Sequence, residues 1–80
     1  MPHFFINFQN VNELIQDDEG IDLPSLEAAR QVALISAREI LADNVKGDAK
    51  DPLQAVIITD ERGREIMTIP AKEVLPDPLK

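Results

Sequence analysis

One long amphipathic stretch, residues 24–45, constrains the fold of this chain more than any other feature. Apolar residues recur in it every three or four positions, as they do along one face of an α-helix. Shorter apolar stretches of alternating character lie on both sides of it. In a chain of 80 residues such a helix buries its apolar face against a small sheet. We therefore expect one α+β domain over residues 1–75 and a flexible C-terminal tail over residues 76–80.

The order of the apolar stretches predicts two β-hairpins that flank the helix, a ββαββ arrangement. We expect three or four mainly antiparallel strands, with the helix packed on one face of the sheet. Gly20 and Gly63 are placed to supply positive φ in the turns, and Pro24 and Ser25 suit the first turn and the cap of the helix. The strands are expected at residues 4–8, 13–16, 55–59 and 64–69, and Pro70 ends the last of them.

Small residues occupy the centre of the apolar face of the helix, with Ala29, Ala33 and Ala37 in one arc. They allow the helix axis to approach the sheet closely, so that large strand side chains fill the space between the two layers. Alternation along the first strand turns one set of side chains towards the helix. This set is Phe4, Ile6 and Phe8.

The charge balance argues against several classes of function. Fifteen acidic and eight basic residues give a formal net charge of −7, and no Lys or Arg precedes Arg30. Because such a chain repels phosphate backbones and has no basic stripe, we do not expect it to bind nucleic acid. The absence of cysteine removes thiolate nucleophiles and thiolate metal ligands. No stretch has the pattern of a signal peptide or a membrane span, and we expect a cytoplasmic protein.

Few residues offer catalytic chemistry. His3 is the only histidine and, by alternation, lies on the outer face of the first strand, where a solvated surface role is expected. The acidic turn at residues 17–22 could attract a cation, but its spacing does not match a calcium-binding loop of the EF-hand type. We therefore expect no enzyme, no catalytic residue, no cofactor and no metal site. A small enzyme that takes its missing groups from a partner subunit or a cofactor is the alternative.

The surplus of apolar residues points instead to an interaction surface. A single helix covers only one face of a sheet, so apolar side chains on the other face, and a second apolar seam on the helix, need another cover. We expect self-association, as a dimer, or a different protein partner. The predicted interaction surface consists of Phe5, Ile35, Ala55, Ile57, Met67 and Ile69.

Several segments together resemble a family of small uncharacterised proteins of rhizobia and related alphaproteobacteria, grouped as a domain of unknown function. The resemblance runs to about Pro70, and it implies a bacterial protein without an assigned activity. It rests on the opening Met-Pro-His-Phe-Phe-Ile-Asn-Phe, the Asp-Asp-Glu-Gly turn, the stretch Ile-Asp-Leu-Pro-Ser-Leu-Glu-Ala-Ala at residues 21–29, the helix through Ala33, Ala37 and Leu41, and the Asp-Glu-Arg-Gly hairpin at residues 60–63.

Residues 23–29 also resemble the N-terminal domain of the acidic antitoxins that mask small RNA-cleaving toxins. This likeness implies a second function, inhibition of a basic nuclease by the acidic surface of the chain. We do not expect a separate DNA-binding domain of the kind that such antitoxins carry.

Overall fold

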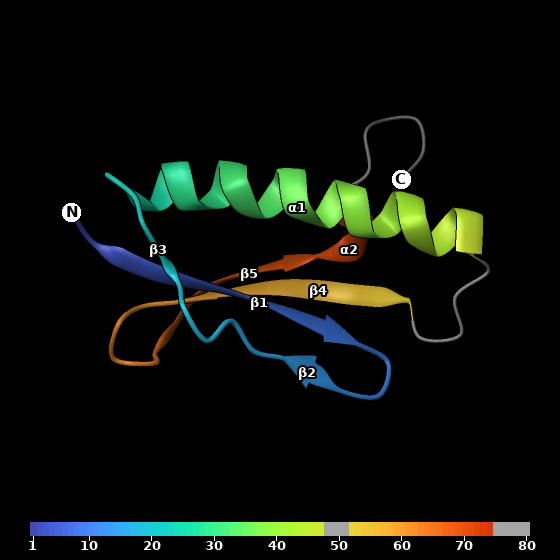
Figure 1. The fold of residues 1–80 in the computed structure, drawn as a ribbon, viewed down its shortest axis with the longest axis horizontal. Coiled ribbons are helices and arrows are strands. Elements are labelled where there is room, and N and C mark those ends of the chain that lie inside the picture. Colours follow the sequence, from blue (N-terminus) through green and yellow to red (C-terminus); the bar gives the residue numbers. More distant parts are fainter. Residues whose placement is uncertain (48–51, 75–80) are drawn as a thin grey trace.

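The computed structural model describes residues 1–47 and 52–74, and it shows one helix laid across one face of a five-stranded antiparallel sheet (Figure 1). A second helix, of a single turn, follows the last strand. The elements are β1 (His3–Asn10), β2 (Leu14–Ile15), β3 (Ile21–Asp22), α1 (Leu26–Gly47), β4 (Leu53–Thr59), β5 (Glu65–Pro70) and α2 (Ala71–Val74).

The strands are arranged in the order β2-β1-β4-β5, and β3 also pairs with β1. The predicted α+β class, with two hairpins around a helix that covers one face, is therefore confirmed. The sheet has five strands instead of the predicted three or four, because the sequence pattern did not predict β3. β2 pairs only with Phe8 and Gln9 of the eight-residue strand β1. The chain returns at residues 21–22 to pair with His3 and Phe4 at the other end of that edge.

Helix α1 begins one residue after its cap. The backbone N–H of Ala28 donates to Oγ of Ser25 at 3.1 Å, so Ser25 is the N-cap and Pro24 lies just before the helix instead of in its first turn. Glu27 places a negative charge in the first turn, where the N-terminal end of the helix dipole favours it. The predicted signals for the helix start are thus present, shifted by about one residue.

Other boundaries differ slightly from the sequence pattern. β1 and β4 extend beyond the predicted strands, and Pro70 is the last residue of β5, where it lies opposite Ala55. Proline is tolerated there because β5 has a ladder partner only on its β4 side within the described part of the chain. The predicted linker at residues 48–51, the domain boundary at residue 75 and the tail at residues 76–80 lie outside the described residues.

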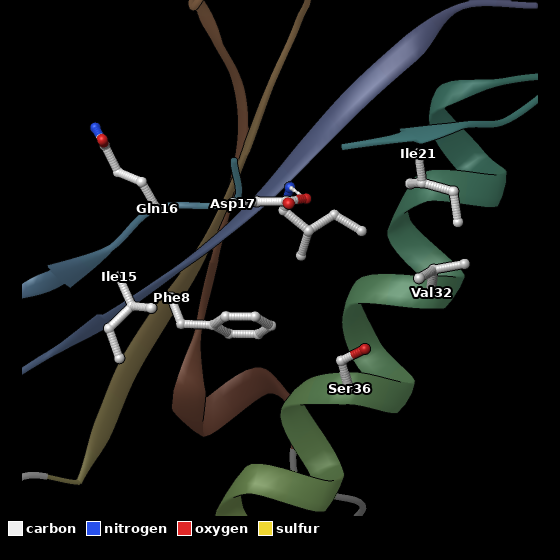
Figure 2. A pocket seen from close by; sticks show the side chains of 8 residues that line it. Phe8, Ile15, Gln16, Asp17, Ile21, Val32 and Ser36 are labelled. Carbon is white, nitrogen blue, oxygen red and sulfur yellow. Dashed lines mark hydrogen bonds between the residues drawn. The ribbon is translucent and has the colours of Figure 1, made fainter. Parts of the chain in front are cut away.

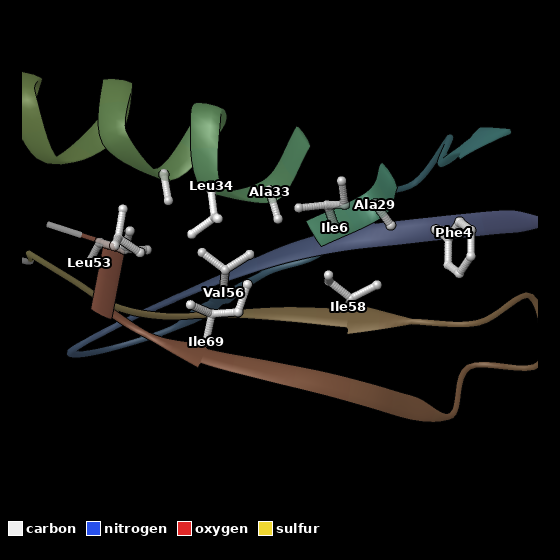
Figure 3. Packing of buried hydrophobic residues seen from close by; sticks show 11 residues of the cluster. Phe4, Ile6, Ala29, Ala33, Leu34, Leu53, Val56, Ile58 and Ile69 are labelled. Carbon is white, nitrogen blue, oxygen red and sulfur yellow. The ribbon is translucent and has the colours of Figure 1, made fainter. Parts of the chain in front are cut away.

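The core lies between α1 and the sheet, and small residues occupy the centre of its helix side as predicted (Figure 3). Ala29, Ala33 and Ala37 have no exposed surface, and neither do Val56 and Ile58 of β4 beneath them. The alanines let the helix come close enough for the branched side chains of the strands to fill the layer. The remaining buried apolar residues are Phe4, Ile6, Leu34, Leu53, Ile69 and Val74.

Met67 and Ile69 were predicted on the uncovered face of the sheet, and that placement is wrong. The β4–β5 register sets Ile69 opposite Val56 and Met67 opposite Ile58, and residues directly opposite each other point to the same face. Ile69 is consequently 4% exposed within the core, and Met67 is half-buried against it. Alternation correctly paired the two residues with each other, but it did not determine which face of the sheet they share.

The single turn α2 closes one end of this core. Val74 is 1% exposed, and its carbonyl oxygen accepts a hydrogen bond from Nε of Arg38 on α1 at 3.2 Å. Both helices therefore pack on the same face of the sheet.

Candidate interaction surface

The sheet face turned away from α1, called the open face below, has no helix or strand over it within residues 1–47 and 52–74 (Figure 1). Its centre is built from β1 and β4, whose register sets Phe5 opposite Thr59, Asn7 opposite Ile57 and Gln9 opposite Ala55. Phe5, Ala55 and Ile57 are half-buried there. The structure thus places three residues of the predicted interaction surface on the same face of two adjacent strands.

A groove of about 610 Å³ crosses the open face. Phe5, Asn7, Ile57 and Thr59 form its floor, which carries no formal charge. Two walls rise from the neighbouring segments, one from the β2 side and one from the hairpin between β4 and β5. The walls are Leu14, Gln16 and Asp17 on one side, and Glu61, Arg62, Gly63 and Glu65 on the other.

Asn7 is the only buried polar residue of the described chain, at 6% exposure, and all of its hydrogen bonds are internal. Its Nδ2 donates to the Ile57 carbonyl at 3.0 Å and to Oγ1 of Thr59 at 3.3 Å, and its Oδ1 accepts the backbone N–H of Asp17 at 2.9 Å. Asn7 therefore ties β1 to β4 on one side and to the groove wall on the other. Alternation predicted its face but gave no sign of this burial, which depends on residues ten and fifty positions away.

Asp17 holds the acidic turn in place by accepting backbone hydrogen bonds. Its Oδ1 accepts from Gly20 N at 3.0 Å and from Glu19 N at 3.2 Å, and its Oδ2 accepts from Ile6 N at 3.2 Å. Desolvation acts to raise the pKa of Asp17, but these N–H donors and the nearby His3 outweigh it, and the pKa lies below its usual value. Its carboxylate also occupies the edge of β1 between the two short stretches that pair with β2 and β3.

His3 connects the start of β1 to the same turn, whereas the sequence predicted a solvated side chain. Its Nδ1 lies 2.6 Å from Oδ1 of Asp22, and its Nε2 lies 2.8 Å from the carbonyl oxygen of Glu19. The ring also contacts Phe5 edge to face, with centroids 5.1 Å apart at an interplanar angle of 76°. The carboxylates of Asp17 and Asp22 thus make internal contacts, and within the described residues no group of three or more His, Asp or Glu side chains is placed to hold a metal.

The opposite wall is held by Asp60. Its Oδ1 accepts the backbone N–H groups of Arg62 and Arg64, each at 2.9 Å, and its Oδ2 lies 3.2 Å from Nε of Arg64. These donors, led by the Arg64 backbone, hold the pKa of Asp60 below its usual value. Gly63 has a φ of 82° and completes the turn as predicted. Both walls are therefore fixed by hydrogen bonds of their own, and they bring charged side chains to the groove rim.

A smaller groove of about 320 Å³ lies on the helix side, between α1 and the β2–β3 edge of the sheet (Figure 2). Its apolar lining comes from Phe8, Ile15 and Ile21 on the strands and from Val32 on the helix. Ile35 is 56% exposed on α1. Since the sheet separates α1 from the open face, Ile35 does not belong to the same surface as Phe5, Ala55 and Ile57, and the predicted six-residue surface is not continuous.

These features define the class of the protein: a small two-layer α+β domain in which one sheet face has no helix over it within residues 1–47 and 52–74 and carries a groove between two hydrogen-bonded walls. The family model described as "Domain of unknown function (DUF6894)" matches residues 3–72, and the chain belongs to this family. The match spans all five strands and α1.

No curated protein and no solved structure matches the chain. The predicted resemblance to a domain of unknown function is confirmed, whereas the alphaproteobacterial origin and the likeness to antitoxins stay predictions. In the described part of the chain, no helix combines the length and the apolar character needed to cross a membrane.

Proposed function

We propose that this domain is a non-enzymatic protein-interaction module that self-associates through the open face. The observation that carries the proposal is the position of Phe5, Ala55 and Ile57, which lie on the two adjacent central strands and on a sheet face that neither helix covers. Leu14, 43% exposed, extends this apolar area to the rim. Removal of such surface from water is worth about 25 cal/mol per Å², and a second domain can provide the cover.

The uncharged floor of the groove and the mixed charges of its rim favour a second copy of the chain as the partner. Two sheets pack face to face through their apolar residues, and a two-fold axis brings the same patch of each copy together. The floor of the groove is uncharged, and the rim carries Arg62 beside Glu61 and Glu65. Unlike charges of the two rims can therefore meet across a two-fold axis, although the net charge of −7 on each copy opposes association at low salt.

Two adjacent residues of β2 provide a matched test. Leu14 and Ile15 are 43% and 51% exposed, but Leu14 lies in the open-face groove and Ile15 in the helix-side groove. Light scattering and sedimentation over a concentration series should show a dimer for the wild type. Leu14→Glu should weaken it by about tenfold or more, because a charge is then buried in the interface. Ile15→Glu should leave the dissociation constant unchanged.

The proposal fails if the wild type is a monomer throughout the concentration series. It fails equally if the two variants weaken the dimer to the same extent, because the interface would then not be confined to the open face. Both substituted positions are exposed, so circular dichroism should confirm that each variant is folded.

An acidic inhibitor of a basic nuclease is a second candidate, and the rim charges favour it. Asp17, Glu61 and Glu65 surround the groove, with Arg62 as the basic residue among its lining. Binding of a basic partner should weaken as salt rises, whereas self-association of acidic copies should be unaffected or strengthened. Calorimetry against small basic nuclease toxins at low and high salt distinguishes the two, and an absence of binding at low salt would remove this candidate.

A further inference from the structure

The two ring nitrogens of His3 both face hydrogen-bond acceptors, and we propose that His3 is a pH-sensitive latch that fastens residues 17–22 to the start of β1. Residues 17–22, called the latch segment below, contain β3. The first residue of this segment, Asp17, lines both grooves. The proposal concerns the position of this segment within one chain. It stands whether or not the domain self-associates.

The geometry requires a particular protonation state of the ring. The Asp22 carboxylate at 2.6 Å from Nδ1 and the Glu19 carbonyl at 2.8 Å from Nε2 can only accept. A neutral imidazole has one N–H, so it satisfies one of these acceptors and turns a lone pair towards the other. The imidazolium ion donates to both. The hydrogen bond to Asp22, followed by that to Glu19, accordingly raises the pKa of His3 above 6.5.

The charged groups around the ring act in the same direction. Asp22 of β3 and Glu61 of the β4–β5 hairpin both favour the charged ring, and Asp17 is in turn stabilised as a carboxylate by His3. All three are acidic: Asp17 and Asp22 belong to the latch segment, and Glu61 belongs to the hairpin between β4 and β5. Partial desolvation is the one influence that opposes protonation.

The latch segment is shaped to receive the ring at Gly20. This glycine has a φ of 71°, and a Cβ atom placed on it would collide with the His3 ring and lie 2.8 Å from the Phe4 carbonyl oxygen. Any larger residue would therefore displace the ring as well as strain the backbone. The close fit at Gly20 is a second observation, independent of the hydrogen bonds, that the imidazole holds this segment.

Loss of the proton should release the segment. Since the pKa of His3 is raised in the folded state, its stabilising effect is complete below pH 6.5, the unfolded value, and disappears as the pH rises through the folded pKa. Above that point one acceptor loses its donor, and the two-residue pairing of β3 with His3 and Phe4 is the adjacent structure that should loosen. The expected change is local, because β1 remains paired with β4.

The presence of a single histidine makes the test direct. On protein without a histidine tag, NMR titration should show the His3 ring changing charge with a midpoint above 6.5. Below the midpoint, both ring nitrogens should carry protons. The amide signals of Glu19, Gly20 and Ile21 should shift with the same midpoint, and their hydrogen exchange should accelerate above it. A midpoint at or below 6.5, or amides that do not follow the ring, would overturn the proposal.

Two matched variants distinguish the effect of the His3–Asp22 contact from the effect of the net charge of the turn. Asp22→Asn removes the carboxylate that contacts Nδ1, and Asp18→Asn removes one charge from an exposed position of the same turn. The midpoint of His3 should fall clearly in Asp22→Asn and scarcely in Asp18→Asn. Equal decreases would mean that the net charge of the turn, and not the latch contact, controls the ring. His3→Gln should remove the pH dependence of the Gly20 amide, and the two Asn variants decide the question if that variant does not fold.

Discussion

The two faces of the sheet carry similar residues but have opposite roles, and β4 shows this most clearly. Val56 and Ile58 have no exposed surface beneath α1, whereas their neighbours Ala55 and Ile57 are half-buried on the open face. Four successive apolar residues thus divide between a packed core and a sheet face that no helix of the described residues covers. Apolar character alone does not distinguish the two faces, and the position of the helix does.

Ile58 and Ile57 provide the largest expected contrast between the faces. Ile58→Ala should lower the free energy of unfolding by about 3–4 kcal/mol, because it leaves a cavity at a fully buried site. Ile57→Ala should cost about 1 kcal/mol, since its side chain already contacts solvent and the gap can fill with water. Urea denaturation of both variants, at a concentration where the chain is monomeric, measures the difference. Equal losses would show that the open face is packed as tightly as the core.

The difference between the faces also marks what the sequence could predict. The helix period located the arc of Ala29, Ala33 and Ala37, and local turn chemistry identified Gly20 and Gly63, because both signals arise from residues close together in the chain. The faces of Met67 and Ile69 depended on the register between β4 and β5. A register is a long-range property, and a shift by one residue reverses every side chain.

The candidate site was harder to predict than the fold for the same reason. Alternation, which is local, correctly put Ala55 and Ile57 on one face of their strand and Phe5 on the outer face of its own, but only the register of β1 against β4 brings them to one surface. The contacts of Asn7 and His3 with residues 17–22 were not predicted, because they need β3 to return to β1. A two-residue strand has no periodicity of its own to reveal it. The sequence contained only indirect signs of β3: an acidic turn, a glycine and a single histidine, which contact one another only in the folded chain.

A substitution of Asn7 tests whether buried polar contacts stabilise the open face, in the way that apolar packing stabilises the core. Asn7→Asp should destabilise the domain by about 2–3 kcal/mol, because a carboxylate cannot donate to the Ile57 carbonyl and would be buried beside it. Gln54→Glu makes the same change at an exposed position of β4 and should cost less than about 0.5 kcal/mol. Thermal unfolding at neutral pH compares them. If Asn7→Asp lowered the stability no more than Gln54→Glu does, the buried hydrogen bonds of Asn7 would have no structural role.

The smallest expected loss of stability belongs to Asp17. Unlike the losses expected at Ile58 and Asn7, it should depend on pH. Because the pKa of Asp17 is lowered in the folded state, its contribution is present above pH 3.8, the unfolded value, and is lost as the pH falls through the folded pKa. Asp17→Asn keeps one acceptor oxygen but turns an NH₂ donor towards a backbone N–H, so it should cost about 1 kcal/mol at neutral pH. At a pH below the folded pKa, the variant and the wild type should have equal stability.

Asp18→Asn provides the control for that experiment, since it removes the same charge from the adjacent exposed residue. Denaturation at neutral and at acidic pH should show a pH-dependent gap between wild type and Asp17→Asn and almost none for Asp18→Asn. A gap of the same size in both variants would mean that repulsion within the acidic turn controls its stability. The hydrogen bonds that the backbone N–H groups of Ile6 and Gly20 donate to Asp17 would then contribute little to holding the groove wall against β1.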